Sequence, residues 1–219
     1  MITALTAQKR DRNRINVFLD GDFAFGLSRI VAAWLHVGQE LSDEKIASLQ
    51  SEDSLEVAYQ KVIRYLSYSR RSTQEVQHYL EKQDVSAEIT EQVVERLQRT
   101  GLINDEHLAR DWVDNRSDNR PRGRRALVYE MKHKGIPDQD IQQALSDWDE
   151  DEMADQAARK YARKINNLDW IDFRKKMYAH LARRGFNYET AAPVVSRIWQ
   201  EISESKDMDN INSSQEVDR

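Results

Sequence analysis

Residues 120–148 read RPRGRRALVYEMKHKGIPDQDIQQALSDW and have the pattern of two short helices separated by a glycine. The first part is basic and carries apolar residues at helical spacing, and Gly135 stands where a helix commonly ends in a left-handed residue. Pro137 suits the first turn of the following helix, because its missing N–H group would have no partner there. The stretch therefore predicts a helix, a tight turn and a second helix.

The same plan recurs about fifty residues earlier and later, at residues 72–97 and 173–198. Three sets of apolar positions are each separated by 51 and then 50 residues. They are Val76, Leu127 and Met177; Leu80, Met131 and Leu181; and Leu97, Trp148 and Ile198. A repeat of this length is typical of helical arrays, in which each unit buries its apolar face against its neighbours. We therefore expect a mainly α protein with three tandem three-helix repeats, resembling helix-turn-helix units, in a curved array.

The residues before the repeats have a different pattern. Residues 15–27, INVFLDGDFAFGL, alternate in part around Asp20 and Gly21, which predicts a short β-hairpin. Residues 28–37 predict a short helix ended by Gly38, and Ser42 is a favourable N-cap for a second short helix. A further helix over about residues 55–67 begins the first repeat. We place the boundaries at residues 1–53 for this extension, 54–103, 104–149 and 150–203 for the repeats, and 204–219 for a disordered acidic tail.

Two local signals mark helix ends in the first repeat. Ser72 and Glu75 have the spacing of a capping box, in which each side chain bonds the backbone N–H group of the other residue. Asp84 stands where the other repeats have Gly135 and Gly185, so it is expected to adopt the left-handed conformation that glycine adopts more easily.

Composition and charge exclude several classes of protein. The net charge is -5, and residues 201–219 carry six acidic and two basic side chains, which leaves the rest of the chain at -5 + 4 = -1. A nearly neutral body does not favour bulk electrostatic binding of nucleic acid, although local basic patches remain compatible with it. The chain has no cysteine, which excludes disulfides and fits a reducing cytoplasm, and no apolar run near the ~20 residues of a membrane span.

The sequence offers no catalytic residue, no metal site and no cofactor site. The five histidines lack metal-ligand spacing, and no serine, histidine and carboxylate are suggestively placed. A glycine pattern at residues 21–28 imitates a phosphate-binding loop, but Leu27 occupies the position that requires lysine. Most of the five tryptophans fit the apolar stripes, so the core is their expected place. Trp170 lies outside them, and the sequence leaves open whether it belongs to the core or to a binding surface.

The remaining functional signal is a set of basic residues at the start of, or along, the second helix of each repeat. The candidate partner-binding residues are Arg70, Arg71, Arg120, Arg122, Arg124, Arg125, Lys132, Lys134, Lys175, Lys176, Arg183 and Arg184. Stacked repeats would align them in one stripe. A solvated face neutralised by nearby carboxylates is the alternative. On either interpretation Arg124 and Arg125 are expected at a solvated helix start, where they contribute little to the core.

Three segments resemble the RecX regulatory family: RYLSYSRRS at residues 64–72, GLINDEHLA at 101–109 and KGI at 134–136. The chain departs from the family pattern at Asp84, usually glycine, and at Leu108, usually aromatic. The resemblance implies a cytoplasmic, non-enzymatic bacterial protein that binds the RecA recombinase filament on single-stranded DNA. Such proteins inhibit its ATPase, strand exchange and coprotease activities and so limit recombination and the SOS response. We expect a monomer, with weak direct DNA contact possible; a direct DNA-binding regulator built from helix-turn-helix-like units is the alternative.

Overall fold

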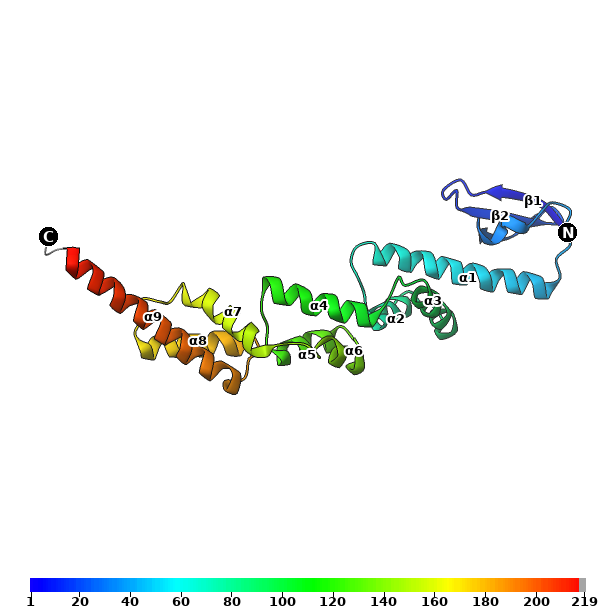
Figure 1. Cartoon of the computed structure of the whole chain (residues 1–219). Coiled ribbons are helices and arrows are strands. Elements are labelled where there is room, and N and C mark those ends of the chain that lie inside the picture. The colour runs from blue at the N-terminus through cyan, green and yellow to red at the C-terminus, as the bar shows by residue number, and fades with distance from the viewer. Residues whose placement is uncertain (217–219) are drawn as a thin grey trace. The chain divides into compact units, whose positions relative to one another are not determined.

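The structure, a computed structural model, describes the backbone of residues 1–216 and the side chains of residues 1–116 and 120–206. In this range it contains nine α-helices, one short 3-10 helix and a three-stranded sheet (Figure 1). The predicted fold class is therefore confirmed. The chain divides into two compact units, Met1–Asn104 and the residues from Asp105 onward, which are described separately.

Unit 1 begins with an antiparallel sheet of strands β1 (Ile2–Ala7), β2 (Arg14–Leu19) and β3 (Asp22–Ser28), in the order β1-β2-β3. The predicted hairpin is β2–β3, and its turn residues Asp20 and Gly21 have φ angles of 50° and 98°, as a type I′ turn requires. Strand β1 was not predicted. The charged loop that joins it to β2 contains no glycine or proline, the strongest turn signals in a sequence.

The helix predicted at residues 28–37 is wrong over most of its length. Ser28 ends β3, and only Val31–Trp34 form a 3-10 helix, η1. The backbone N–H group of Arg29 donates to the carbonyl of Asn13 at 2.7 Å, which holds this point of the chain at one end of the sheet. The backbone of Ile2 then pairs with Gly38 and Gln39 at the other end, at 2.8 Å each. The segment must span the sheet between these two anchors. A longer helix would be too short to connect them, because a helix advances less per residue than extended chain.

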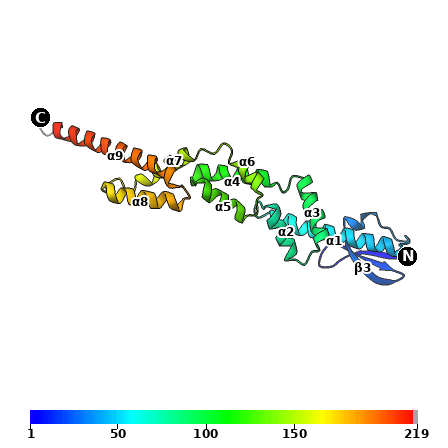
Figure 2. The ribbon, with the colours of Figure 1, turned by 90° about the horizontal axis from the view of Figure 1, so that it is seen from below.

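Helix α1 (Asp43–Leu66) is one continuous helix of 24 residues, where the sequence predicted two. The Ser42 side chain accepts a hydrogen bond from the backbone N–H of Lys45 at 3.2 Å, which confirms the predicted cap. The first half of α1 packs against the sheet through Leu49 (Figure 2), and the second half supplies Ala58 and Val62 to the first repeat. The boundary placed after residue 53 thus lies inside a helix that serves both parts.

Two buried carboxylates of α1 hold these parts together. Asp53 pairs with Arg14 of β2 at 2.9 Å and accepts a hydrogen bond from the backbone N–H of Ser28. One turn further along, Glu56 pairs with Arg96 of the first repeat at 2.9 Å. Because each buried charge has a charged partner, the desolvation cost of burying it is offset.

The first repeat consists of the second half of α1 with α2 (Thr73–Glu81) and α3 (Ala87–Arg99). The capping box is present: Ser72 Oγ accepts from the N–H of Glu75 at 3.1 Å, and Glu75 Oε2 accepts from the N–H of Ser72 at 3.0 Å. Asp84 has a φ angle of 55°, so its predicted left-handed conformation is confirmed.

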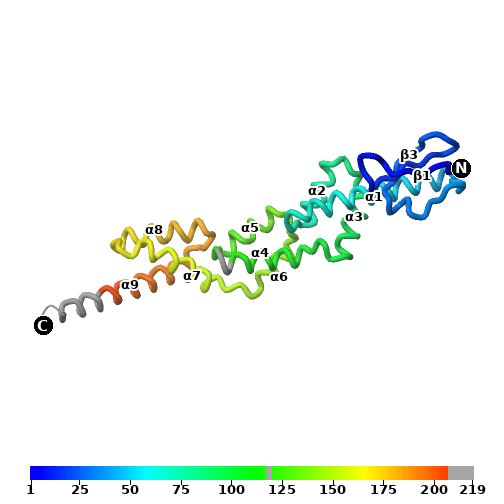
Figure 3. The backbone as a smooth tube through the Cα atoms, turned by 90° about the horizontal axis from the view of Figure 1, so that it is seen from above, coloured from blue at the N-terminus to red at the C-terminus, as the bar shows by residue number. Residues whose placement is uncertain are grey.

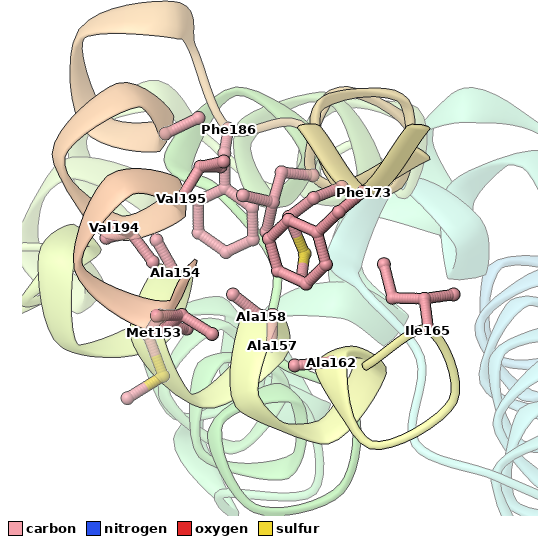
Figure 4. Close-up of a cluster of buried hydrophobic side chains, with 14 residues drawn as sticks. Met153, Ala154, Ala157, Ala158, Ala162, Ile165, Phe173, Phe186, Val194 and Val195 are labelled. Carbon is pink, nitrogen blue, oxygen red and sulfur yellow. The ribbon is translucent and has the colours of Figure 1, made fainter. Parts of the chain in front are cut away.

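Unit 2 contains the other two repeats (Figure 3). Helices α4 (Asp105–Asn119), α5 (Arg124–His133) and α6 (Asp138–Ala144) form the second repeat. Helices α7 (Glu150–Ala162), α8 (Trp170–Arg183) and α9 (Tyr188–Glu216) form the third. Figure 4 shows the core of the third repeat, where Phe173 faces the small residues Ala157 and Ala158 of α7. Trp148 packs against the cores of both repeats and joins them.

Helix α9 continues to Glu216, beyond the point where the sequence predicts a disordered tail. The side chains of residues 207–216 and all of residues 217–219 lie outside the described part of the chain, so the prediction for the tail stays a prediction. None of the helices, as far as they are described, is long and apolar enough to cross a membrane.

Replacing Asp53 by alanine should lower the free energy of unfolding by about 3 kcal/mol, because Arg14 and the N–H of Ser28 would lose their buried partner. Urea denaturation of the full chain measures this. Glu52→Ala is the matched control: its exposed neighbouring carboxylate bonds only Ser48 among the described residues, so its loss should stay within about 0.5 kcal/mol. Equal effects of the two substitutions would contradict the assigned role of Asp53.

Replacing Asp84 by glycine should raise the free energy of unfolding by about 0.5–1 kcal/mol, because glycine adopts a positive φ angle without the steric cost of a Cβ atom. Gly135→Ala is the reverse change at the equivalent residue, whose φ angle is 74°, and should destabilise the protein. Thermal unfolding of the two variants beside the wild type checks both signs.

Candidate partner-binding surface

The candidate basic residues lie on or next to the middle helix of each repeat, as the sequence predicts, but the structure divides them into two groups. One group packs against its own repeat, and one member, Arg184, also contacts the neighbouring repeat. The other projects into solvent. The division follows helix phase, since residues one position apart on a helix point about 100° apart.

The first group surrounds a contact that recurs in all three repeats. An aromatic residue of the first helix meets a side chain of the middle helix, and the three middle-helix positions are again 51 and 50 residues apart. The pairs are Tyr65 with Tyr79 (stacked, ring centroids 4.3 Å apart), Trp112 with Glu130 (Nε1 to Oε2, 3.0 Å) and Tyr161 with His180 (stacked, 3.9 Å).

A candidate basic residue accompanies each of these pairs. The guanidinium of Arg71 lies 4.5 Å from the centroid of the Tyr65 ring, and Lys134 Nζ lies 5.2 Å from that of Trp112. Arg184 Nε donates to His180 Nε2 at 3.0 Å. Contacts between a cation and an aromatic face contribute about 0.5–1 kcal/mol where solvent reaches them. Arg71 and Lys134 stabilise their own repeats through such contacts, and Arg184 does so through its hydrogen bond to His180.

Arg124 holds three helix ends together. Its guanidinium donates to the carbonyl of Leu145 at 3.0 Å and to Gln142 Oε1 at 2.9 Å, at the carboxyl end of α6. Its backbone N–H donates to Glu150 Oε1 at 3.1 Å, at the start of α7. The expectation that Arg124 lies at a solvated helix start is wrong. The carbonyl groups at the end of a short helix lack partners within it, and Arg124 supplies one.

The carboxyl end of α8 meets the amino end of α5, so the two middle helices lie end to end in space (Figure 3). The N–H of Gly123 donates to the carbonyl of Arg184 at 2.9 Å, and the Arg184 guanidinium donates to the carbonyl of Pro121 at 3.1 Å. A methyl group on Gly123 would overlap the backbone of Gly185, so the close approach requires glycine. We call this contact the α8–α5 joint.

Positive charge is concentrated at the joint. Burial lowers the pKa of Arg184, and the nearby charges of Arg122 and Arg120 lower it further. Burial, followed by the charge of Arg184, also lowers the pKa of His180 to about 4. The imidazole is therefore neutral at pH 7 and accepts the hydrogen bond from Arg184. Glu130 partly compensates the cluster through an ion pair with Arg122 at 3.6 Å.

The second group lies on the side of the middle helices opposite the buried residues. Arg125 and Lys175 each precede a fully buried residue by two positions, and both are exposed. The same two helices also carry exposed apolar residues, with Tyr129 72% and Ile171 75% exposed. We name the exposed residues Arg125, Tyr129, Ile171, Lys175, Lys176 and Arg183 of these two helices the α5–α8 surface. Helix α8 carries only one acidic residue, Asp172, so its exposed side is basic.

The other candidates are distributed as follows. Lys132 is exposed but pairs with Asp138 at 2.9 Å, and Arg120 is exposed beside the joint. Arg70 is exposed in unit 1. Arg70 and Arg71 belong to a different unit from the rest, so the single stripe predicted across three repeats stays a prediction. Trp170, left open by the sequence, is half-buried in the third core, with its ring centroid 5.4 Å from that of Trp199.

Comparison with known domain families gives four matches along the chain. They are described as the regulatory protein RecX N-terminal domain, at residues 1–42, and the first, second and third three-helix domains of RecX, at residues 58–97, 104–145 and 149–195. The three-helix matches coincide with the three repeats, and the first match covers the sheet and η1.

Whole-chain comparisons agree with these matches. The chain is 31% identical to the regulatory protein RecX of Bacillus pumilus, across 94% of this chain and 80% of that protein. It is 32% identical to that of Bacillus licheniformis, across 94% and 79%. Among solved structures, a crystal structure of regulatory protein RecX superposes with a TM-score of 0.72 at 26% identity, over 88% of this chain and 98% of that one. RecX from Lactobacillus salivarius shares the fold, with a TM-score of 0.60 at 23% identity over 67% and 97%.

Adjacent arginines provide a direct test of the two groups. Arg124→Gln removes the hydrogen bonds to Leu145 and Gln142 and should cost about 1–2 kcal/mol in the free energy of unfolding. Arg125→Gln removes an exposed side chain that has no ion pair with a described residue, and should change stability by less than about 0.5 kcal/mol. Denaturant titration of both variants is the measurement, and the reverse order would contradict the structure.

Proposed function

The chain belongs to the RecX family of regulatory proteins, and we propose on this basis that it binds the RecA recombinase filament on single-stranded DNA and inhibits it. The proposed inhibition covers the ATPase, strand-exchange and coprotease activities of the filament, and thereby limits recombination and the SOS response. The protein would act in the cytoplasm as a binding protein rather than an enzyme, without a cofactor. The described residues contain no cluster suited to hold a metal ion.

The observation that carries the proposed binding mode is the α5–α8 surface. Its four cations lie on helices whose opposite sides are fixed by buried residues and whose ends are fixed at the joint. A rigid basic face is suited to an acidic protein surface, where complementary charge gives specificity and speeds association. The exposed Tyr129 and Ile171 add apolar contact area, and Tyr and Arg are frequent among residues that dominate binding energy.

The helix starts argue against the alternative of a DNA-binding regulator that uses its repeats as helix-turn-helix modules. In such modules the residues at the amino end of the last helix approach the base edges. Here the first turns are acidic: they contain Glu88 in α3, Asp138 and Asp140 in α6, and Glu189 in α9. Carboxylates at these positions would repel the phosphate backbone.

Reversing two charges on the α5–α8 surface, with Arg125→Glu and Lys175→Glu together, should weaken inhibition of the RecA filament's ATPase on the order of tenfold. The loss should be larger at low ionic strength, because salt screens exposed charges. Half-maximal inhibitory concentrations at two salt concentrations measure both effects. Circular dichroism should show an unchanged fold, since both side chains are exposed.

The matched control is Lys160→Glu with Arg163→Glu, which reverses two exposed charges at the carboxyl end of α7 in the same unit. This control should inhibit like the wild type. Equal loss in both double variants would mean that net charge, not this surface, determines binding. Unchanged inhibition by the Arg125 and Lys175 variant would show that the surface faces solvent in the complex.

A further inference from the structure

An exposed apolar stripe lies on the N-terminal part of unit 1, over η1 and its flanks. Trp34 is 89% exposed, and Ile30 and Val37 are each 60% exposed. Between them, Ala32 is buried and Val31 and Leu35 pack against the sheet core, while Ala33 and His36 are exposed. The other four tryptophans of the chain are half-buried. Core packing therefore accounts for every indole except that of Trp34.

A basic cluster lies at one end of the same sheet. Lys9, Arg10 and Arg12 are exposed in the loop between β1 and β2. The backbone bond from Arg29 to Asn13, at 2.7 Å, places the exposed Arg29 beside this loop. Asp11 is the acidic residue of the cluster, which leaves a local charge of 4 - 1 = +3. Arg14 is excluded from this count because it pairs with the buried Asp53.

The charge of this small sheet is polarised. Asp20 and Asp22 lie at the β2–β3 turn, which in an antiparallel meander is at the opposite end from the β1–β2 loop. The amino terminus pairs with Asp20 at 3.1 Å at that end. Trp34 ends η1, five residues after Arg29, and so belongs to the short segment that leaves the basic end of the sheet.

We propose that Trp34 and the basic cluster of Lys9, Arg10, Arg12 and Arg29 form a binding site for single-stranded nucleic acid. An exposed aromatic side chain beside a cationic surface is the combination that such proteins use, with a base stacked on the ring and phosphates on the cations. The contact requires no sequence readout, because every base presents a π-face. It is independent of the proposed recombinase partner and lies in the other unit from the α5–α8 surface.

The polarisation favours a flexible strand over an anionic membrane as the partner. A membrane presents a plane of negative charge, which would meet the acidic end of the sheet, with Asp20, Asp22 and Glu40, as well as the basic end. A single strand follows the basic end alone and turns its bases toward Trp34. One exposed 3-10 turn is also too short to form the apolar face of an interfacial helix.

The test is binding of a fluorescently labelled oligothymidylate to the full chain, followed by anisotropy at several salt concentrations. Trp34→Ala should weaken binding about tenfold, the effect of losing one stacked base. Trp34→Phe keeps an aromatic face and should restore most of the affinity. Unlabelled oligothymidylate should also quench the intrinsic tryptophan fluorescence of the wild type, and most of that change should be absent in Trp34→Phe.

Arg10→Glu with Arg12→Glu should weaken binding and make its salt dependence shallower by about 1.4 in log–log slope, the value for two phosphate contacts on a single strand. Lys160→Glu with Arg163→Glu, in the third repeat, should leave binding unchanged. The proposal is overturned if the wild type does not bind below about 100 µM at low salt. It is equally overturned if neither Trp34→Ala nor the double variant differs from wild type, or if vesicles of anionic lipid bind while the oligonucleotide does not.

Discussion

Burial of two side chains one turn apart on each middle helix is the constraint on which the repeats depend. Val76 and Leu80, Leu127 and Met131, and Met177 and Leu181 are all fully buried. Once these positions are fixed, helix geometry determines the direction of every other side chain on the same helix. The residues two positions before the buried ones, Arg125 and Lys175 among them, must then face solvent. The α5–α8 surface is thus a consequence of the core rather than a separate feature.

The same constraint explains which features could be predicted from the sequence. Apolar spacing identified the repeats, and the capping box at Ser72 and the left-handed Asp84 followed from local rules. Arg124 and Arg125 show a difference that the sequence did not predict. They are adjacent and chemically identical, yet one bonds the end of α6 and the other is exposed. The difference depends on where α6 ends in space, which no local pattern contains.

The prediction for the N-terminal part was incomplete for a related reason. The sequence predicted a break in α1 because its two halves bury different faces against different partners, the sheet and the first repeat. Asp53 and Glu56 would ordinarily indicate solvent exposure, yet both are buried because Arg14 and Arg96 reach them from residues about 40 positions away. Strand β1 likewise depends on a partner strand rather than on its own pattern. The periodicity of a single sequence does not reveal which distant charges or strands pair with each other.

The distribution of charge connects these structural points with binding. The chain carries a net charge of -5, so its long-range field does not attract a polyanion. The basic residues act locally instead: some are neutralised inside their own repeats, as Arg122 is by Glu130, and others are exposed in clusters. Such a surface discriminates by geometry, because cations at fixed spacing bind an acidic partner that matches them and gain little from one that does not. A weak general attraction combined with strong local complementarity therefore favours partners that match the geometry of these clusters over polyanions that do not.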